Sequence, residues 1–74
     1  MNTRTEKFDS GWVGISLALS QEEIELLIRR LSQLKLSEIT HFHLRNEIWE
    51  NGEGVADIEI TLVGNEETDN MIID

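Results

Sequence analysis

Apolar residues recur every three or four positions between Leu17 and Leu36, the spacing of an amphipathic helix. Ser20 and Glu23 stand three residues apart at its start, in the pattern of a capping box. Acidic residues gather in the first turns and basic residues toward the end, as the helix dipole favours. The pattern predicts a helix over residues 21–35, with Leu26 on its opposite face and one apolar stripe formed by Ile24, Leu27, Ile28, Leu31 and Leu34.

Three other stretches alternate between apolar and polar residues and are predicted to be strands: residues 12–19, 39–49 and 55–63. Gly14, inside the first of them, either weakens the strand or marks the close approach of a neighbouring group. Residues 1–9 are polar and are expected to form a flexible N-terminus. The alternative is a strand over Thr3–Phe8 that turns at Asp9-Ser10-Gly11. Residues 64–74 form an acidic C-terminal segment, in which residues 71–73 add a short strand or pack on a neighbour.

This order of elements predicts a single α+β domain over residues 1–74. The expected architecture is a βαββ two-layer sandwich, with one helix packed on a small sheet of three or four strands through a right-handed crossover. A two-residue turn in the hairpin would mix apolar and polar residues on both faces. A three-residue loop, residues 51–53, keeps the faces separate. It places Phe42 opposite Leu62, Leu44 opposite Ile60 and Ile48 opposite Ala56, with the helix on the face of Val13, Leu44 and Ile60.

A chain of 74 residues buries a small core, and its lack of cysteine excludes disulfides and thiolate zinc sites. A homodimer is therefore expected to supply further burial. The N-terminal residues lack the apolar segment of a signal peptide, and no apolar run is long enough to cross a membrane. We expect a cytoplasmic protein.

Charge is distributed unevenly along the chain, whose formal net charge is −9. Residues 1–45 hold six acidic and six basic side chains, whereas residues 46–74 hold nine acidic side chains and neither Lys nor Arg. Such a field disfavours direct binding to nucleic acid or to an anionic membrane. It favours a basic protein partner, and the alternative is that the charge serves solubility alone.

The sheet face away from the helix carries Trp12 and Trp49 among charged residues, which predicts an interface there. The alternative is that the predicted register is wrong near the turn. In the predicted register Arg45 faces Glu59, and Glu47 faces Asp57. Trp49 is the expected anchor of a partner-binding surface. The candidate partner-binding residues are Glu47, Trp49, Asp57, Glu59, Glu66, Glu67 and Asp69.

His41 and His43 project from one face of the same strand and could together chelate a metal ion. A protein site normally has three or four ligands, and the predicted cross-strand neighbours, Val63 and Thr61, supply none. No metal or other cofactor is therefore expected. Asp57 and Glu59 could act as an acid and a base only in a pocket that shifts their pKa, which a small flat sheet does not offer. We expect no catalytic residues and no enzymatic activity.

The capped helix, the following His41-Phe42-His43-Leu44, Trp49 and the glycines Gly52 and Gly54 resemble a group of small bacterial immunity proteins of polymorphic-toxin systems. The similarity spans residues 13–63. It implies a non-enzymatic inhibitor. The sequence thus predicts an acidic protein that neutralises a basic partner, such as a nuclease toxin or another nucleic-acid-binding protein. The alternative is a homo-oligomeric structural or accessory domain.

Overall fold

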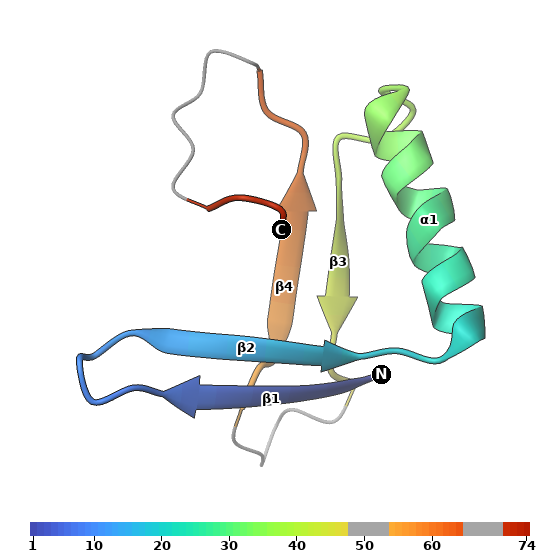
Figure 1. Ribbon diagram of the computed structural model, residues 1–74. Helices are drawn as coiled ribbons and strands as arrows, with labels where there is room; N and C mark the ends of the chain where they lie inside the picture. Colours follow the sequence, from blue (N-terminus) through green and yellow to red (C-terminus); the bar gives the residue numbers. More distant parts are fainter. Residues whose placement is uncertain (48–53, 65–70) are drawn as a thin grey trace.

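The computed structural model describes residues 1–47, 54–64 and 71–74 (Figure 1). Its elements are β1 (Asn2–Lys7), β2 (Val13–Ala18), α1 (Gln21–Lys35), β3 (His41–Arg45) and β4 (Asp57–Thr61). The fold is small and α+β, as predicted. The strands, however, form two separate two-stranded sheets, β1–β2 and β3–β4. The prediction of one sheet of three or four strands under a single helix is therefore wrong. Within the described residues, no helix has the length and apolar character needed to span a membrane.

The first sheet is a local hairpin at the N-terminus. β1 pairs antiparallel with β2 along its whole length, from Asn2 opposite Ala18 to Lys7 opposite Val13. In the turn, the amide of Gly11 donates to the carbonyl of Phe8 at 3.0 Å, and Gly11 has a φ of 96°, which glycine adopts at low cost. Residues 2–7 thus form a strand, close to the alternative prediction of a strand over Thr3–Phe8. A short turn closes at little entropic cost, so β2 takes its partner from the adjacent segment and not from β3 or β4.

Gly14 is the point in β2 where a side chain comes close to the backbone. A Cβ atom at this position would lie 3.3 Å from Cε2 of Phe8. The expectation of a close approach at Gly14 is thereby confirmed.

Helix α1 has the predicted bounds because local signals define both of its ends. The Ser20 amide donates to Oε1 of Glu23 at 3.0 Å, and the Glu23 amide donates to Oγ of Ser20 at 3.2 Å, which completes the capping box. At the C-terminus Ser37 adopts a φ of 60°. Its amide donates to the carbonyl of Leu34, and the Glu38 amide donates to that of Gln33. This is a Schellman motif with serine in the position where glycine is usual.

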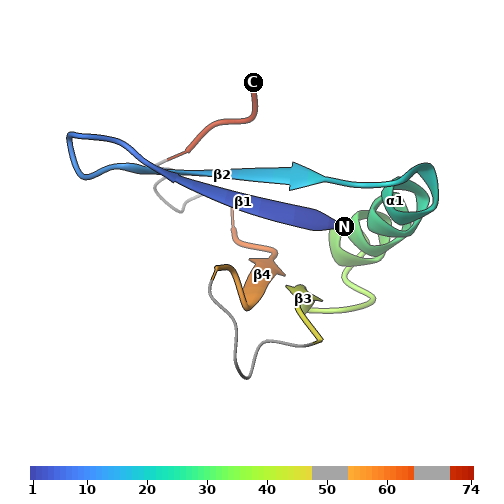
Figure 2. The same ribbon diagram turned by 90° about the horizontal axis from the view of Figure 1, so that it is seen from below.

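The two sheets lie in different layers. The β1–β2 hairpin runs across the region where β3 ends and β4 begins, and α1 stands beside β3 (Figures 1 and 2). Among the described residues, the buried apolar side chains are Leu34 of α1 and Phe42 of β3. The rest of the predicted stripe is less covered, and Ile24, Ile28 and Leu31 are exposed. The prediction that this stripe covers the sheet is therefore wrong for most of its length.

This arrangement leaves the chain open for its size. Its accessible surface is 7269 Å², against roughly 4,700 Å² for a compact monomer of this mass. Its radius of gyration is 14.3 Å, against about 11 Å for a compact chain of this length. An open groove of about 390 Å³ lies where the N-terminus, the start of α1 and the β3–β4 sheet approach one another. The monomer thus exposes apolar surface that a single compact core would bury.

The register of the β3–β4 hairpin differs from the predicted one by two residues. Phe42 lies opposite Ile60, Leu44 opposite Ile58 and Arg45 opposite Asp57. The Asn46 amide donates to the carbonyl of Ala56 at 2.9 Å and extends this pairing toward the turn. Side chains alternate with a period of two, so an offset of two changes each residue's partner but leaves it on its predicted face. The predicted loop, residues 51–53, lies outside the described residues, and Ile48 does too.

Candidate functional site

The polar face of the β3–β4 hairpin gathers the titratable side chains of both strands. Phe42 and Leu44 alternate with polar residues in β3, as do Ile58 and Ile60 in β4, so each strand turns its polar set to one side. The register sets one histidine directly opposite one carboxylate. The face carries His41, His43, Arg45, Asp57, Glu59 and Thr61.

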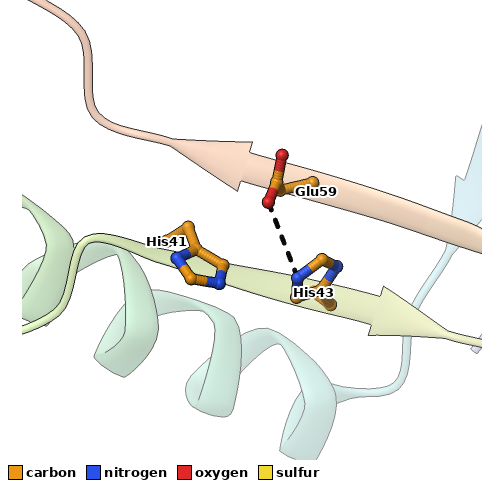
Figure 3. Close-up of side chains that lie close together, drawn as sticks. All are labelled: His41, His43 and Glu59. Carbon is orange, nitrogen blue, oxygen red and sulfur yellow. Dashed lines mark ion pairs between the residues drawn. The ribbon is translucent and has the colours of Figure 1, made fainter.

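His43 is the centre of this face, between two carboxylates of β4. Its Nδ1 lies 3.0 Å and 3.1 Å from the two carboxylate oxygens of Asp57. An ionised carboxylate can only accept a hydrogen bond, so this contact places a proton on Nδ1. The other ring nitrogen, Nε2, lies 3.7 Å from Oε1 of Glu59 (Figure 3). The His43 side chain is 21% exposed, the least exposed of the paired groups on this face.

His41 stands beside His43 on the same strand. The two rings are perpendicular, with centroids 5.2 Å apart. Nδ1 of His41 lies 2.9 Å from Oγ1 of Thr40. One ligand atom from each of His41, His43 and Glu59 can be chosen so that all three lie within 4.8 Å of one another. Figure 3 shows the two rings and the carboxylate converging from neighbouring strands. The set has the nitrogen and oxygen donors that a divalent transition-metal ion binds.

Asp57 connects His43 to a cation at the end of β3. Nε of Arg45 donates to Oδ1 of Asp57 at 3.3 Å. Asp57 is therefore shared between the imidazole and the guanidinium. Glu59 is 54% exposed and keeps its carboxylate open to solvent. Of these two acids, Glu59 is the more available to an approaching molecule.

The structure brings together only part of the predicted partner-binding set. Asp57 and Glu59 lie on one face, as expected, and Glu47 is exposed two residues beyond β3. The predicted pairing of Arg45 with Glu59 and of Glu47 with Asp57 is wrong, because Arg45 faces Asp57 and His43 faces Glu59. Four predicted residues lie outside the described residues: Trp49, Glu66, Glu67 and Asp69.

Trp12 does not belong to this face, contrary to the prediction. It lies at the β1–β2 turn, where its backbone carbonyl accepts from the amide of Phe8 at 2.8 Å, and its side chain is 78% exposed. Because β1–β2 is a separate sheet, the exposed face of β3–β4 carries no contribution from β2. The prediction that Trp12 shares an interface with the β3–β4 face is therefore wrong.

Sequence reasoning missed Glu59 as a third group beside the two histidines. The predicted register set Thr61 opposite His43, whereas the observed register sets Glu59 there. The predicted and the observed registers keep the same side chains on each face, so the alternation in the sequence is compatible with both. Shifting the predicted register by two residues would have placed Glu59 opposite His43.

Comparisons with models of known protein families, with curated proteins and with solved structures found no significant match to this chain.

Proposed function

We propose that this chain is a small acidic binding protein, without enzymatic activity, that neutralises a basic protein such as a nuclease toxin or another nucleic-acid-binding protein. The observation that carries the proposal is the uneven charge. All of the excess negative charge lies in residues 46–74, whereas residues 1–45 are neutral in sum. A localised acidic region attracts a cationic surface and speeds encounter with it.

The β3–β4 face supports this proposal through the accessibility of its acids. The Glu59 carboxylate is more than half exposed, and Glu47 is exposed beside the same hairpin. Asp57 is half exposed, although Arg45 and His43 share its charge. We therefore expect Glu59 to contribute more to partner binding than Asp57. The proposed surface adds Trp49 as an apolar anchor and the tail acids Glu66, Glu67 and Asp69.

The resemblance to immunity proteins supports the same function. The helix, His41-Phe42-His43-Leu44 and Trp49 carry that resemblance. Such a protein acts by occupying the surface of its target and needs no catalytic group. We propose that this chain inhibits in that way.

A pull-down from lysate of the source cells, at low and at physiological salt, tests the proposal. One variant neutralises the tail acids by Glu66→Gln, Glu67→Gln and Asp69→Asn. A matched control makes the same change in charge within the balanced half of the chain, by Glu22→Gln, Glu25→Gln and Glu38→Gln. We expect one stoichiometric basic protein that the wild type and the control retain and that the tail variant loses.

The salt dependence must then be measured with the purified partner. We expect its affinity for the wild type to fall steeply as ionic strength rises, because exposed charges are screened. Equal loss of the partner in both triple variants would show that only net charge matters. Retention of the partner by the tail variant would contradict the proposal.

The second candidate function is a homo-oligomeric structural or accessory domain. The specific observation in its favour is exposed apolar surface: Val13 and Ile15 of β2 and Ile28 of α1 are each more than half exposed. An apolar self-interface is insensitive to salt, unlike electrostatic encounter with a basic partner. A pull-down that recovers only further copies of this chain, unchanged by salt, would favour this candidate. A homodimer is compatible with both functions.

A further inference from the structure

We propose that His41, His43 and Glu59 form a zinc-binding site on the polar face of the β3–β4 hairpin. Two ligands come from β3 and the third from β4, so the ion would bridge the two strands. The inference rests on the geometry of this face and not on the proposed function, although Glu59 belongs both to the zinc site and to the proposed partner-binding surface.

The donor atoms are placed close to the spacing that zinc requires. Ligands at about 2.0–2.1 Å from a tetrahedral ion lie roughly 3.3 Å from one another. Nε2 of His43 and Oε1 of Glu59 are 3.7 Å apart, and the three chosen donor atoms lie within 4.8 Å of one another. We expect side-chain rotation to close the remaining distance on binding, because His41 and Glu59 are exposed at the surface.

The groups behind the histidines support the assignment. Metal-ligating histidines usually donate their second ring N–H to a carboxylate or another oxygen, which orients the ring and leaves the opposite nitrogen free for the metal. Asp57 accepts from Nδ1 of His43, so Nε2 of that ring is the free nitrogen. Thr40 provides an oxygen 2.9 Å from Nδ1 of His41, which leaves Nε2 of that ring available. Both rings thus have an oxygen partner on the nitrogen that would not bind zinc.

The competing interpretation is a protonated His43 held between two carboxylates. In that case Nδ1 donates to Asp57 and Nε2 is attracted to Glu59, without any metal. This interpretation accounts for His43 but assigns nothing to His41, whose ring stands edge-to-face against it. The zinc site uses both rings and the same two carboxylates.

Zinc would add a cross-link to the ion pairs that Asp57 already makes between the two strands. β3 and β4 are joined through a long connection, and the chain has no cysteine. An ion bound only by the paired strands stabilises the paired state. Three protein ligands leave one tetrahedral position for a water molecule or for a donor from a bound partner.

Isothermal titration calorimetry of Zn²⁺ into the full-length protein at pH 7 tests the site. We expect one ion per chain, and we expect heteronuclear NMR to show that zinc shifts the ring resonances of both histidines. Asp57→Ala removes the oxygens that orient the His43 ring, and it should weaken binding about 10–100-fold, the usual effect of losing such a group. His41→Ala and Glu59→Gln, which remove ligands, should weaken it at least as much. Glu47→Gln is the matched control, since it removes an exposed acid from the same hairpin but no ligand, and it should bind as the wild type does.

Several results would overturn the site. These are the absence of zinc-dependent heat, wild-type affinity in His41→Ala, or equal losses in Glu59→Gln and Glu47→Gln. Competition by millimolar Mg²⁺ would identify general acidic binding instead. Circular dichroism checks that each variant folds. If a ligand variant does not fold, the NMR titration of the wild type still decides, because zinc must move both ring signals.

Discussion

Ser37 holds a backbone conformation that suits glycine better than serine. Its φ of 60° ends α1 in a Schellman motif, where a left-handed residue is required. This conformation costs a residue with a Cβ about 1–2 kcal/mol. Glycine avoids that cost, but its greater freedom in the unfolded chain cancels part of the gain in stability. We predict that Ser37→Gly raises the free energy of unfolding by about 0.5–1 kcal/mol, measured by urea denaturation. Ser37→Ala keeps the Cβ and should give no gain, so equal stabilisation by both substitutions would contradict the prediction.

Glu23 has a pKa below its ordinary value, and this makes the helix start sensitive to acid. The N-terminal ammonium of Met1, 2.7 Å from Oε2, is the largest cause, followed by the hydrogen bond from the Ser20 amide. A carboxyl whose pKa is lowered by folding stabilises the folded state above its unfolded pKa, near 4.5, and loses that contribution as pH falls through its folded pKa.

We therefore predict that part of the loss of stability below about pH 4.5 comes from Glu23. Chemical denaturation at a series of pH values should show a shallower acid dependence in Glu23→Gln than in the wild type. Glu22→Gln removes a charge from the same turn but none of these hydrogen bonds, and it serves as the control. Identical pH profiles for the wild type and Glu23→Gln would refute the assignment.

At the scale of elements, the features that depend on neighbouring residues in the sequence, such as helix bounds and strand faces, were predicted correctly. The bounds of α1 followed from the capping box of Ser20 and Glu23 and from the apolar period. The faces of β3 and β4 followed from their alternation. The register did not, because pairing Phe42 with Ile60 or with Leu62 satisfies the same alternation. The candidate metal site depends on this distinction, since only the observed register sets Glu59 opposite His43.

The register can be tested with engineered disulfides, since the chain has no cysteine of its own. Directly opposed residues in an antiparallel pair lie close enough for a disulfide, whereas diagonal neighbours are about 7–8 Å apart, beyond its usual span. We predict that the double variant Arg45→Cys, Asp57→Cys oxidises readily to a disulfide. Arg45→Cys, Glu59→Cys represents the alternative register and should keep free thiols. Mass spectrometry after mild oxidation compares the two, and preferential bridging of the second pair would refute the observed register.

For the whole molecule, the sequence predicted the pairing of β3 with β4 correctly, but it failed to identify the partner of β2. A strand, a helix and a hairpin are compatible with one sheet, and the alternation in β2 does not identify its neighbour. The Asp9-Ser10-Gly11 turn made β1 the nearest partner, and that pairing removes β2 from the sheet of β3 and β4. As a consequence, the two sheets cover only part of the apolar stripe of α1, and the rest of the stripe is exposed. A monomer with so much exposed apolar surface is expected to associate.

The helix provides the sharpest test of association, because it exposes apolar residues on two different faces. Ile28 belongs to the apolar stripe and is 58% exposed, whereas Leu26 lies on the opposite face and is 46% exposed. If a second copy covers the stripe, a charge at position 28 is buried without a partner in the dimer, whereas a charge at position 26 stays in water. We predict that Ile28→Asp is monomeric at concentrations where the wild type and Leu26→Asp sediment as dimers in analytical ultracentrifugation.

The monomer itself should tolerate both substitutions, since each side chain already contacts water, so circular dichroism should show a retained helix in both. A wild type that sediments as a monomer at every concentration would mean that the stripe is covered by a different protein or left exposed. Dissociation by Leu26→Asp alone would assign the interface to the other face of α1. Dissociation by Ile28→Asp alone would show that the excess apolar surface of α1 is the part of the fold that a second chain completes.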